Sequence, residues 1–182
     1  MKKIFYLFAG VNGAGKSTLY NSEKLDNDIK NSIRINTDEI VKKIGIWKNN
    51  SDQIRAAKIA INLRNECFQY DKSFNEETTL TGKTILKTIN KAKELGYELQ
   101  LFYVGVNNPE IAKERIKNRV EKGGHNIEND VVEKRYSFSN NKILFKSNES
   151  ISWAKEVIEI IENKIKENLW RKIEKSKSKG LE

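Results

Sequence analysis

The sequence predicts an α/β fold in which a mainly parallel sheet is flanked by helices in three layers. Two observations lead to this expectation. Short apolar segments typical of strands alternate with segments of helical periodicity, which favours a parallel sheet covered on both faces. The length of 182 residues suits a single domain, and 7 Phe, 6 Tyr and 3 Trp can supply its core.

The first half of the chain is expected to begin with a buried strand. We expect, in order, a strand over residues 3–9, a helix over 16–25, a strand over 32–36, a helix from Thr37 to Gly45, a longer helix from Ser51 and a strand over 72–80. The first strand is apolar, rich in aromatic residues and ended by Gly10. Thr37 is the predicted cap of its helix. The longer helix has apolar residues at helical spacing that predict its buried face: Ile54, Ala57, Ile61 and Phe68.

The second half continues the alternation of helix and strand. We expect a helix over 83–95, a strand over 97–106, a helix over 110–121, a helix over 129–137, a short strand over 143–146 and a long helix over 151–173. Pro109 suits the first turn of a helix. No repeat or linker divides the chain, so we expect one domain over residues 1–170 and a basic, frayed tail over 171–182.

Composition excludes several classes of function. The net charge of +9 is compatible with a polyanionic partner or simply with lysines on solvated helix faces. A single cysteine, Cys67, excludes an internal disulfide and a cysteine-based zinc site. The apolar run over residues 4–9 is too short for a signal peptide, and no run is long enough to span a membrane. We therefore expect a cytoplasmic protein with no membrane segment.

The most specific motif is a P-loop that follows the first predicted strand. Residues 10–18, Gly-Val-Asn-Gly-Ala-Gly-Lys-Ser-Thr, match the pattern G-x-x-x-x-G-K-[ST]. The glycines allow backbone N–H groups to face one concavity, and the next helix points its positive end there. We expect Lys16 to act on the β- and γ-phosphates of ATP and Ser17 to hold Mg²⁺. The predicted nucleotide-binding residues are Gly10, Asn12, Gly13, Ala14, Gly15, Lys16, Ser17 and Thr18.

An acidic residue distinguishes between the classes of P-loop protein. The additional motifs of switch GTPases are not found, and the strand over 97–106 ends in Val-Asn-Asn without the acid of a motor ATPase. Asp38, after the second predicted strand, could accept the proton of a substrate hydroxyl or help to position Mg²⁺. It could also simply cap a helix. With the P-loop, Asp38 favours a small-molecule kinase.

Four segments in order resemble the zeta toxin family. They are the P-loop, Ile-Asn-Thr-Asp-Glu-Ile over 35–40, Phe-Asn-Glu-Glu-Thr-Thr-Leu over 74–80, and Arg-Val-Glu-Lys-Gly-Gly-His-Asn-Ile over 119–127 with Arg135-Tyr136 downstream. The resemblance implies a P-loop kinase fold and ATP-dependent phosphorylation of a sugar hydroxyl on a UDP-amino sugar such as UDP-N-acetylglucosamine. It also implies a possible protein antitoxin as partner.

The resemblance also implies roles for individual residues. Asp38 corresponds to the base that deprotonates the sugar hydroxyl, and Lys16 is catalytic. Three residues correspond to substrate-binding positions: Glu77, Thr78 and Thr79. Arg119 and Arg135 resemble arginines that bind phosphates and offset charge in the transition state, and Arg115 competes with Arg119 for this role. His125 is either a loop histidine or a contact of the nucleotide or the lid.

Other functions remain open at this point. The basic tail and the +9 charge would also suit a nucleic-acid kinase, although no aromatic residues follow Trp170 for base stacking. Another small metabolite could be the acceptor. The segment after Tyr136 is shorter than is usual in the family, which would also fit a non-catalytic ATP-binding module.

Overall fold

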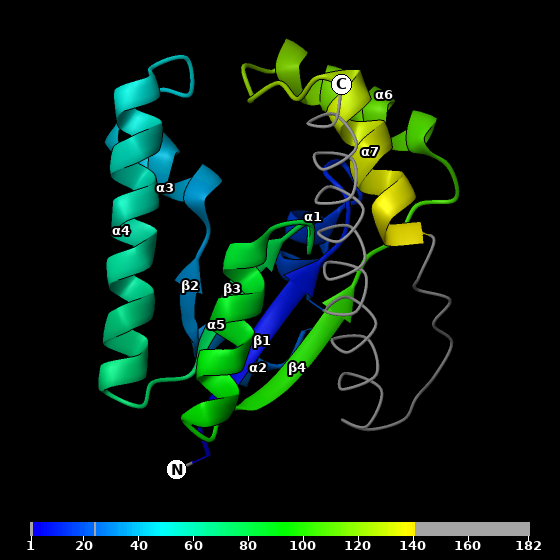
Figure 1. Ribbon diagram of the computed structural model, residues 1–182. Coiled ribbons are helices and arrows are strands. Elements are labelled where there is room, and N and C mark those ends of the chain that lie inside the picture. Colours follow the sequence, from blue (N-terminus) through cyan, green and yellow to red (C-terminus); the bar gives the residue numbers. More distant parts are fainter. Residues whose placement is uncertain (1, 24, 141–182) are drawn as a thin grey trace, which may run out of the picture. The chain divides into compact units, whose positions relative to one another are not determined.

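A parallel sheet lies at the centre of the computed structural model, which describes residues 2–23 and 25–140, with side chains up to residue 137 (Figure 1). The strands of the described part are β1 (Ile4–Ala9), β2 (Ile33–Ile35), β3 (Phe74–Thr78) and β4 (Glu98–Tyr103), in the order β2-β3-β1-β4. Every neighbouring pair is parallel. The carboxyl ends of the strands therefore meet at one edge, where ligands bind in sheets of this type.

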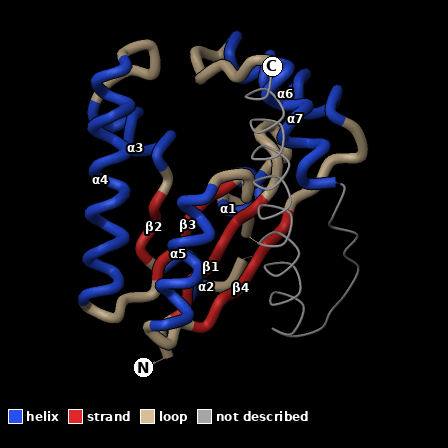
Figure 2. Tube along the Cα trace, in the orientation of Figure 1, coloured by secondary structure: helices blue, strands red, loops and turns tan. Residues whose placement is uncertain are grey.

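Helices lie on both sides of this sheet (Figure 2). They are α1 (Lys16–Tyr20), α2 (Asn27–Asn31), α3 (Thr37–Ile44), α4 (Asn50–Gln69), α5 (Lys83–Glu94), α6 (Pro109–Glu121) and α7 (Asn129–Asn140). In Figure 1, α5 crosses in front of the sheet and α1 and α2 lie behind it. This arrangement confirms the predicted α/β fold with a parallel sheet flanked by helices. None of the helices in the described ranges combines the length and apolarity needed to cross a bilayer.

Strand β1 is buried on both faces, as its apolar sequence predicts. Tyr6 and Phe8 point to the side of α1 and α2, where they form a core cluster with Ile29. On the other face Phe5 stacks on Phe74 of β3, with ring centroids 4.3 Å apart. The central strand is thus fixed by aromatic packing from both sides, and the loop that follows it starts from a rigid base.

The end of α1 and the cap of α3 differ from the sequence-based prediction. The helix predicted over 16–25 ends at Tyr20, because the N–H and hydroxyl of Ser22 both bond to the Leu19 carbonyl and close the last turn. The short helix α2 then follows and was not predicted. Thr37 was expected to cap α3, but the cap is Asn36, whose side chain accepts hydrogen bonds from the N–H groups of Asp38 and Glu39.

The buried face predicted for α4 is wrong except at Phe68. Ile54 and Ile61 are 49% and 48% exposed, and Ala57 is also exposed. The buried positions of α4 include Ala56 and Ala60 instead. Because α4 packs closely against α3, small side chains occupy the contact and larger ones are displaced to the outside.

The strands are shorter than predicted. The last hydrogen bond between β4 and β1 runs from the N–H of Val104 to the carbonyl of Ala9, which is the last residue of β1. Because β1 ends there, β4 ends at Tyr103. β3 ends at Thr78 before Leu80, which adopts a left-handed conformation with φ of 55°. The strand predicted over 143–146, the helix over 151–173 and the tail over 171–182 lie outside the described residues.

Candidate functional site

The P-loop occupies the turn between β1 and α1, at the carboxyl edge of the sheet. Its glycines are needed for steric reasons at two positions. A Cβ at Gly10, with φ of 143°, would overlap the carbonyl of Val104, and a Cβ at Gly13, with φ of 78°, would overlap the carbonyl of Ala112. The loop therefore lies directly against the end of β4 and against α6, and no larger residue fits these two positions.

Lys16, the first residue of α1, is held inside the loop. Its side chain is nearly buried, and its Nζ donates to the carbonyls of Gly10 and Val11 at 2.9 and 3.1 Å. Burial lowers the pKa of the Lys16 ammonium, and the nearby carboxylates of Glu77 and Asp38 oppose this change. The ammonium is thus fixed beside the loop backbone, at the wall of the cavity.

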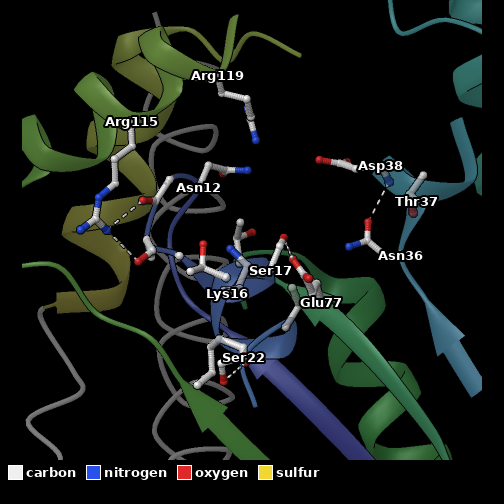
Figure 3. A pocket seen from close by; sticks show the side chains of 17 residues that line it. Asn12, Lys16, Ser17, Ser22, Asn36, Thr37, Asp38, Glu77, Arg115 and Arg119 are labelled. Atoms are coloured by element: carbon white, nitrogen blue, oxygen red, sulfur yellow. Dashed lines mark hydrogen bonds between the residues drawn. The ribbon is translucent and has the colours of Figure 1, made fainter. Parts of the chain in front are cut away.

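Ser17 and Glu77 meet at the end of β3. The Ser17 hydroxyl donates to Glu77 Oε2 at 3.1 Å (Figure 3). The other oxygen of Glu77 accepts from Arg34 of β2, and both side chains are only 13% exposed. Arg34 also contacts the ring of Tyr20 at 3.7 Å. The buried guanidinium therefore orients the carboxylate of Glu77 toward the P-loop serine.

The two threonines after Glu77 also lie at the site. Thr78 accepts a hydrogen bond from the N–H of Leu80 at 3.0 Å. Thr79 shares a hydrogen bond of 2.8 Å with the hydroxyl of Thr81. Both hydroxyls therefore help to shape the loop that closes the carboxyl end of β3, close to the P-loop.

Asp38 approaches the site from the opposite wall, in the first turn of α3 (Figure 3). Because Asn36 caps this helix, the Asp38 carboxylate is not used as a cap, and its side chain is 47% exposed. Burial of the carboxyl would raise the pKa of Asp38, but His125, Arg119 and Lys16 together lower it below its usual value. Asp38 is thus an ionised carboxylate at neutral pH, as a proton acceptor must be.

The three arginines occupy different places around the P-loop. Arg119 points from α6 into the space between the P-loop and Asp38, and its Nη2 donates to the carbonyl of His125 at 2.6 Å (Figure 3). Arg115 donates to the carbonyls of Gly13 and Ala14 at 3.4 and 2.9 Å. Arg135 of α7 contacts Asn12 Oδ1 at 2.5 Å. Arg115 and Arg135 therefore brace the loop, and Arg119 faces the cavity.

One cavity of about 880 Å³ joins these elements. It is lined by all the predicted nucleotide- and substrate-binding residues except Gly10, together with Asp38 and Arg119. Gly10 lies at its base through the contact with Lys16. Arg135 does not line this cavity but a smaller one of about 300 Å³, which shares Thr78 and Thr79 with it.

Sequence reasoning missed three residues of this site. Arg34 stands in a strand of three residues, where no periodicity marks its side chain as buried. Asn36 could have been found, because Asn36 and Glu39 have the spacing of a capping box, and their side chains do bond at 3.1 Å. Trp47 carried no signal, since its partner His125 is distant in the chain.

A parallel sheet with a P-loop after its first strand, facing a carboxylate and an arginine, places the chain among P-loop kinase-type phosphotransferases. Solved structures agree on the fold. A Chloroflexus aurantiacus protein provisionally described as a kinase is similar with a TM-score of 0.56 and 16% identity, over 74% of this chain and 80% of that one. A chain of the Pnkp1/Rnl/Hen1 RNA repair complex has a TM-score of 0.58 and 19% identity, over 84% of this chain and 51% of that one.

Within this class, the chain belongs to the zeta toxin family, whose sequence model matches residues 1–174. The chain is also 38% identical to an uncharacterized protein of Haemophilus influenzae over 137 residues, which cover 74% of this chain and 92% of that protein. The resemblance noted in four segments of the sequence is therefore confirmed.

Proposed function

We propose that the protein transfers the γ-phosphoryl group of ATP to a sugar hydroxyl of a UDP-amino sugar such as UDP-N-acetylglucosamine. The observation that supports this most strongly is the position of Asp38, which faces Lys16 and Ser17 across a single cavity. A P-loop alone binds nucleotide, whereas a carboxylate opposite it offers a base for an acceptor. Membership of the zeta toxin family supports the choice of UDP-sugar.

The P-loop would bind the nucleotide. Its backbone would hold the phosphates of ATP, and Lys16 would stay beside the β- and γ-phosphates. Mg²⁺ fits this end by donor chemistry, because the Ser17 hydroxyl and the Glu77 carboxylate are oxygen donors of the kind it prefers, and they lie 3.1 Å apart. When bound, this ion would neutralise charge on the phosphates.

The residues that would act on the acceptor come from α3 and from the end of β3. Asp38 would take the proton of the sugar hydroxyl as its oxygen forms a bond to the γ-phosphorus. The bond from that phosphorus to the bridging oxygen of ADP breaks, and ADP leaves. Arg119 faces this point and would offset the negative charge of the transition state. Thr78 and Thr79 line the cavity beside the acceptor and would hold it. Glu77, to which the family resemblance gives the same role, would instead serve the Mg²⁺ end, because its carboxylate accepts a hydrogen bond from Ser17.

Arg135 has a different role in this scheme from the one that the family resemblance implies. Its contact with Asn12 would keep the P-loop closed over the phosphates from the side of α7. ATP as donor implies a cytoplasmic reaction. We further propose that a protein antitoxin restrains the enzyme, as the name of the family indicates.

The test is incubation of the purified protein with labelled ATP, Mg²⁺ and UDP-N-acetylglucosamine, followed by mass analysis of the sugar nucleotide. A phosphorylated sugar nucleotide is expected, and Lys16→Ala should abolish its formation. Other UDP-sugars, nucleosides and oligonucleotides with a free 5′-hydroxyl serve as competing acceptors. Transfer only to an oligonucleotide, or ATP binding with no transfer to any acceptor, would contradict the proposal.

A further inference from the structure

Two loops from opposite walls of the cavity meet through a pair of aromatic rings. Trp47 lies in the loop between α3 and α4, and His125 lies in the loop between α6 and α7. Figure 1 shows these loops facing each other at the top of the view. The imidazole of His125 stacks on the indole of Trp47, with centroids 4.1 Å apart and planes inclined by 15°. The stacked pair is a direct contact between the two walls, and the proposed function gives no role to either residue.

The loop of Trp47 is fixed to the start of α4. Asp52, a buried carboxylate, accepts a hydrogen bond from the N–H of Ile46 at 3.1 Å. A side chain at Gly45 would overlap this carboxylate. Gln53 donates to the carbonyl of Trp47 at 2.7 Å. The indole is therefore presented from a braced turn and not from a loose one.

The loop of His125 is fixed to the arginine that faces the cavity. The N–H of Gly124 donates to the carbonyl of Arg119 at 2.9 Å, and Arg119 Nη2 donates to the carbonyl of His125 at 2.6 Å. A Cβ at Gly124 would lie 2.5 Å from Arg119 Cγ. The backbone of the His125 loop is therefore bonded directly to Arg119.

The imidazole of His125 also approaches the carboxylate of Asp38. His125 Nδ1 lies 3.8 Å from Asp38 Oδ2, slightly beyond hydrogen-bond length. Nδ1 is buried, and within the described ranges it has no hydrogen-bond partner, which is costly for a polar atom unless a partner comes within reach. A small movement of the His125 loop or of the start of α3 would bring the Asp38 carboxylate within hydrogen-bond length.

We propose that Trp47 and His125 form an aromatic latch over the acceptor end of the cavity, in which His125 is the positioning residue for the Asp38 carboxylate. The stack on Trp47 holds the imidazole in place, and Nδ1–H holds one carboxylate oxygen so that the other faces the acceptor hydroxyl. This proposal rests on the proposed function for the role of Asp38. The latch itself, as a contact between the two loops, is independent of it.

The latch can be tested by NMR without any turnover. The chain has a single histidine, so the ring protons of His125 give unique signals. Stacking on Trp47 should shift them upfield, and Trp47→Leu should move them toward the values of a free histidine. Tyr70→Leu is the matched control, because Tyr70 is 62% exposed on the far end of α4. Asp38→Asn should also change the His125 shifts. Ring protons at free-histidine values in the unaltered protein, or insensitive to Trp47→Leu, would overturn the latch.

The positioning role is tested by His125→Phe, which keeps a ring to stack on Trp47 but removes the nitrogen that faces Asp38. We expect kcat to fall by about 10- to 100-fold with the KM for ATP unchanged, because misplacement of a base affects the chemical step. His125→Asn, which restores an N–H donor, should recover part of the loss.

The pH profile separates positioning from a merely structural effect. Asp38 is faced by His125, Arg119 and Lys16, all of which lower its pKa against the effect of burial. Removing His125 should therefore move the acid limb of kcat to higher pH. Unchanged kcat and an unchanged acid limb in His125→Phe would overturn the positioning role. Absence of transfer in the unaltered protein would instead overturn the proposed function, and the NMR result would still decide the latch.

Discussion

Replacement of Arg34 by methionine should be among the most damaging single changes outside the aromatic core. Arg34 is 13% exposed, and it bonds to Glu39, Asn75 and Glu77. Arg34→Met leaves the carboxylate of Glu77, also 13% exposed, without its cation. Breaking a buried pair in this way costs about 3–5 kcal/mol. The lost contact with Tyr20 adds to that cost. Since domains are stable by only about 5–15 kcal/mol, the loss should be obvious in urea unfolding followed by circular dichroism.

Two controls make the result interpretable. The double variant Arg34→Met/Glu77→Gln removes both charges, so it should recover much of the stability lost in the single variant. Arg55→Met breaks the pair with Asp52 at 3.5 Å, in which the arginine is 63% exposed, and should cost no more than about 1 kcal/mol. A loss in Arg34→Met no larger than in Arg55→Met, or a double variant as unstable as the single one, would refute the reasoning.

Two further changes test the P-loop and the core. Gly13→Ala should lower the free energy of unfolding by about 2 kcal/mol or more and weaken ATP binding, because φ at Gly13 is 78° and the new Cβ would overlap the Ala112 carbonyl. Gly82→Ala is the control and should leave urea unfolding and ATP binding unchanged, because no atom lies within 4 Å of a Cβ at that position. Burial raises the pKa of Cys67 to about 11 and that of Tyr97 to about 12. Both groups keep their protons to higher pH in the folded than in the unfolded chain, so stability should be level below about pH 8, where the unfolded thiol is still protonated, and decline as the pH rises toward these values. Cys67→Ala should make the decline shallower in urea titrations at stepped pH, and a decline equally steep in this variant would contradict the assignment.

Local patterns were sufficient for the parts of the fold that depend on neighbouring residues. The apolar run of β1 and the glycines of the P-loop are contiguous in sequence, so both strand and loop could be predicted. The place of Asp38 just after the second strand could likewise be predicted, because it depends only on neighbouring residues. That Asp38 lies near the P-loop follows from the parallel sheet alone, because the carboxyl ends of parallel strands lie at one edge.

The remainder depended on contacts between distant segments. Helical spacing shows which residues of α4 share a face, but it does not show which face is turned to α3, and Ile54 and Ile61 lie on the outer one. Glu77 reaches Ser17 only because β3 lies next to β1. The pairing of Trp47 with His125 similarly requires two loops on separate helix pairs to meet. No pattern within either segment contains that information.

The most direct test of the proposed chemistry is a single-turnover measurement with the Asp38→Asn variant. Labelled ATP is bound to an excess of enzyme, UDP-N-acetylglucosamine is added, and transfer of the γ-phosphoryl group is followed in time. Asparagine keeps the size of the side chain but cannot accept a proton, so transfer should slow by at least about 100-fold, the lower range for loss of a general base. ATP affinity should stay close to that of the unaltered protein, because the P-loop is untouched. Transfer at an unaltered rate in Asp38→Asn would contradict the assignment of Asp38 as the base.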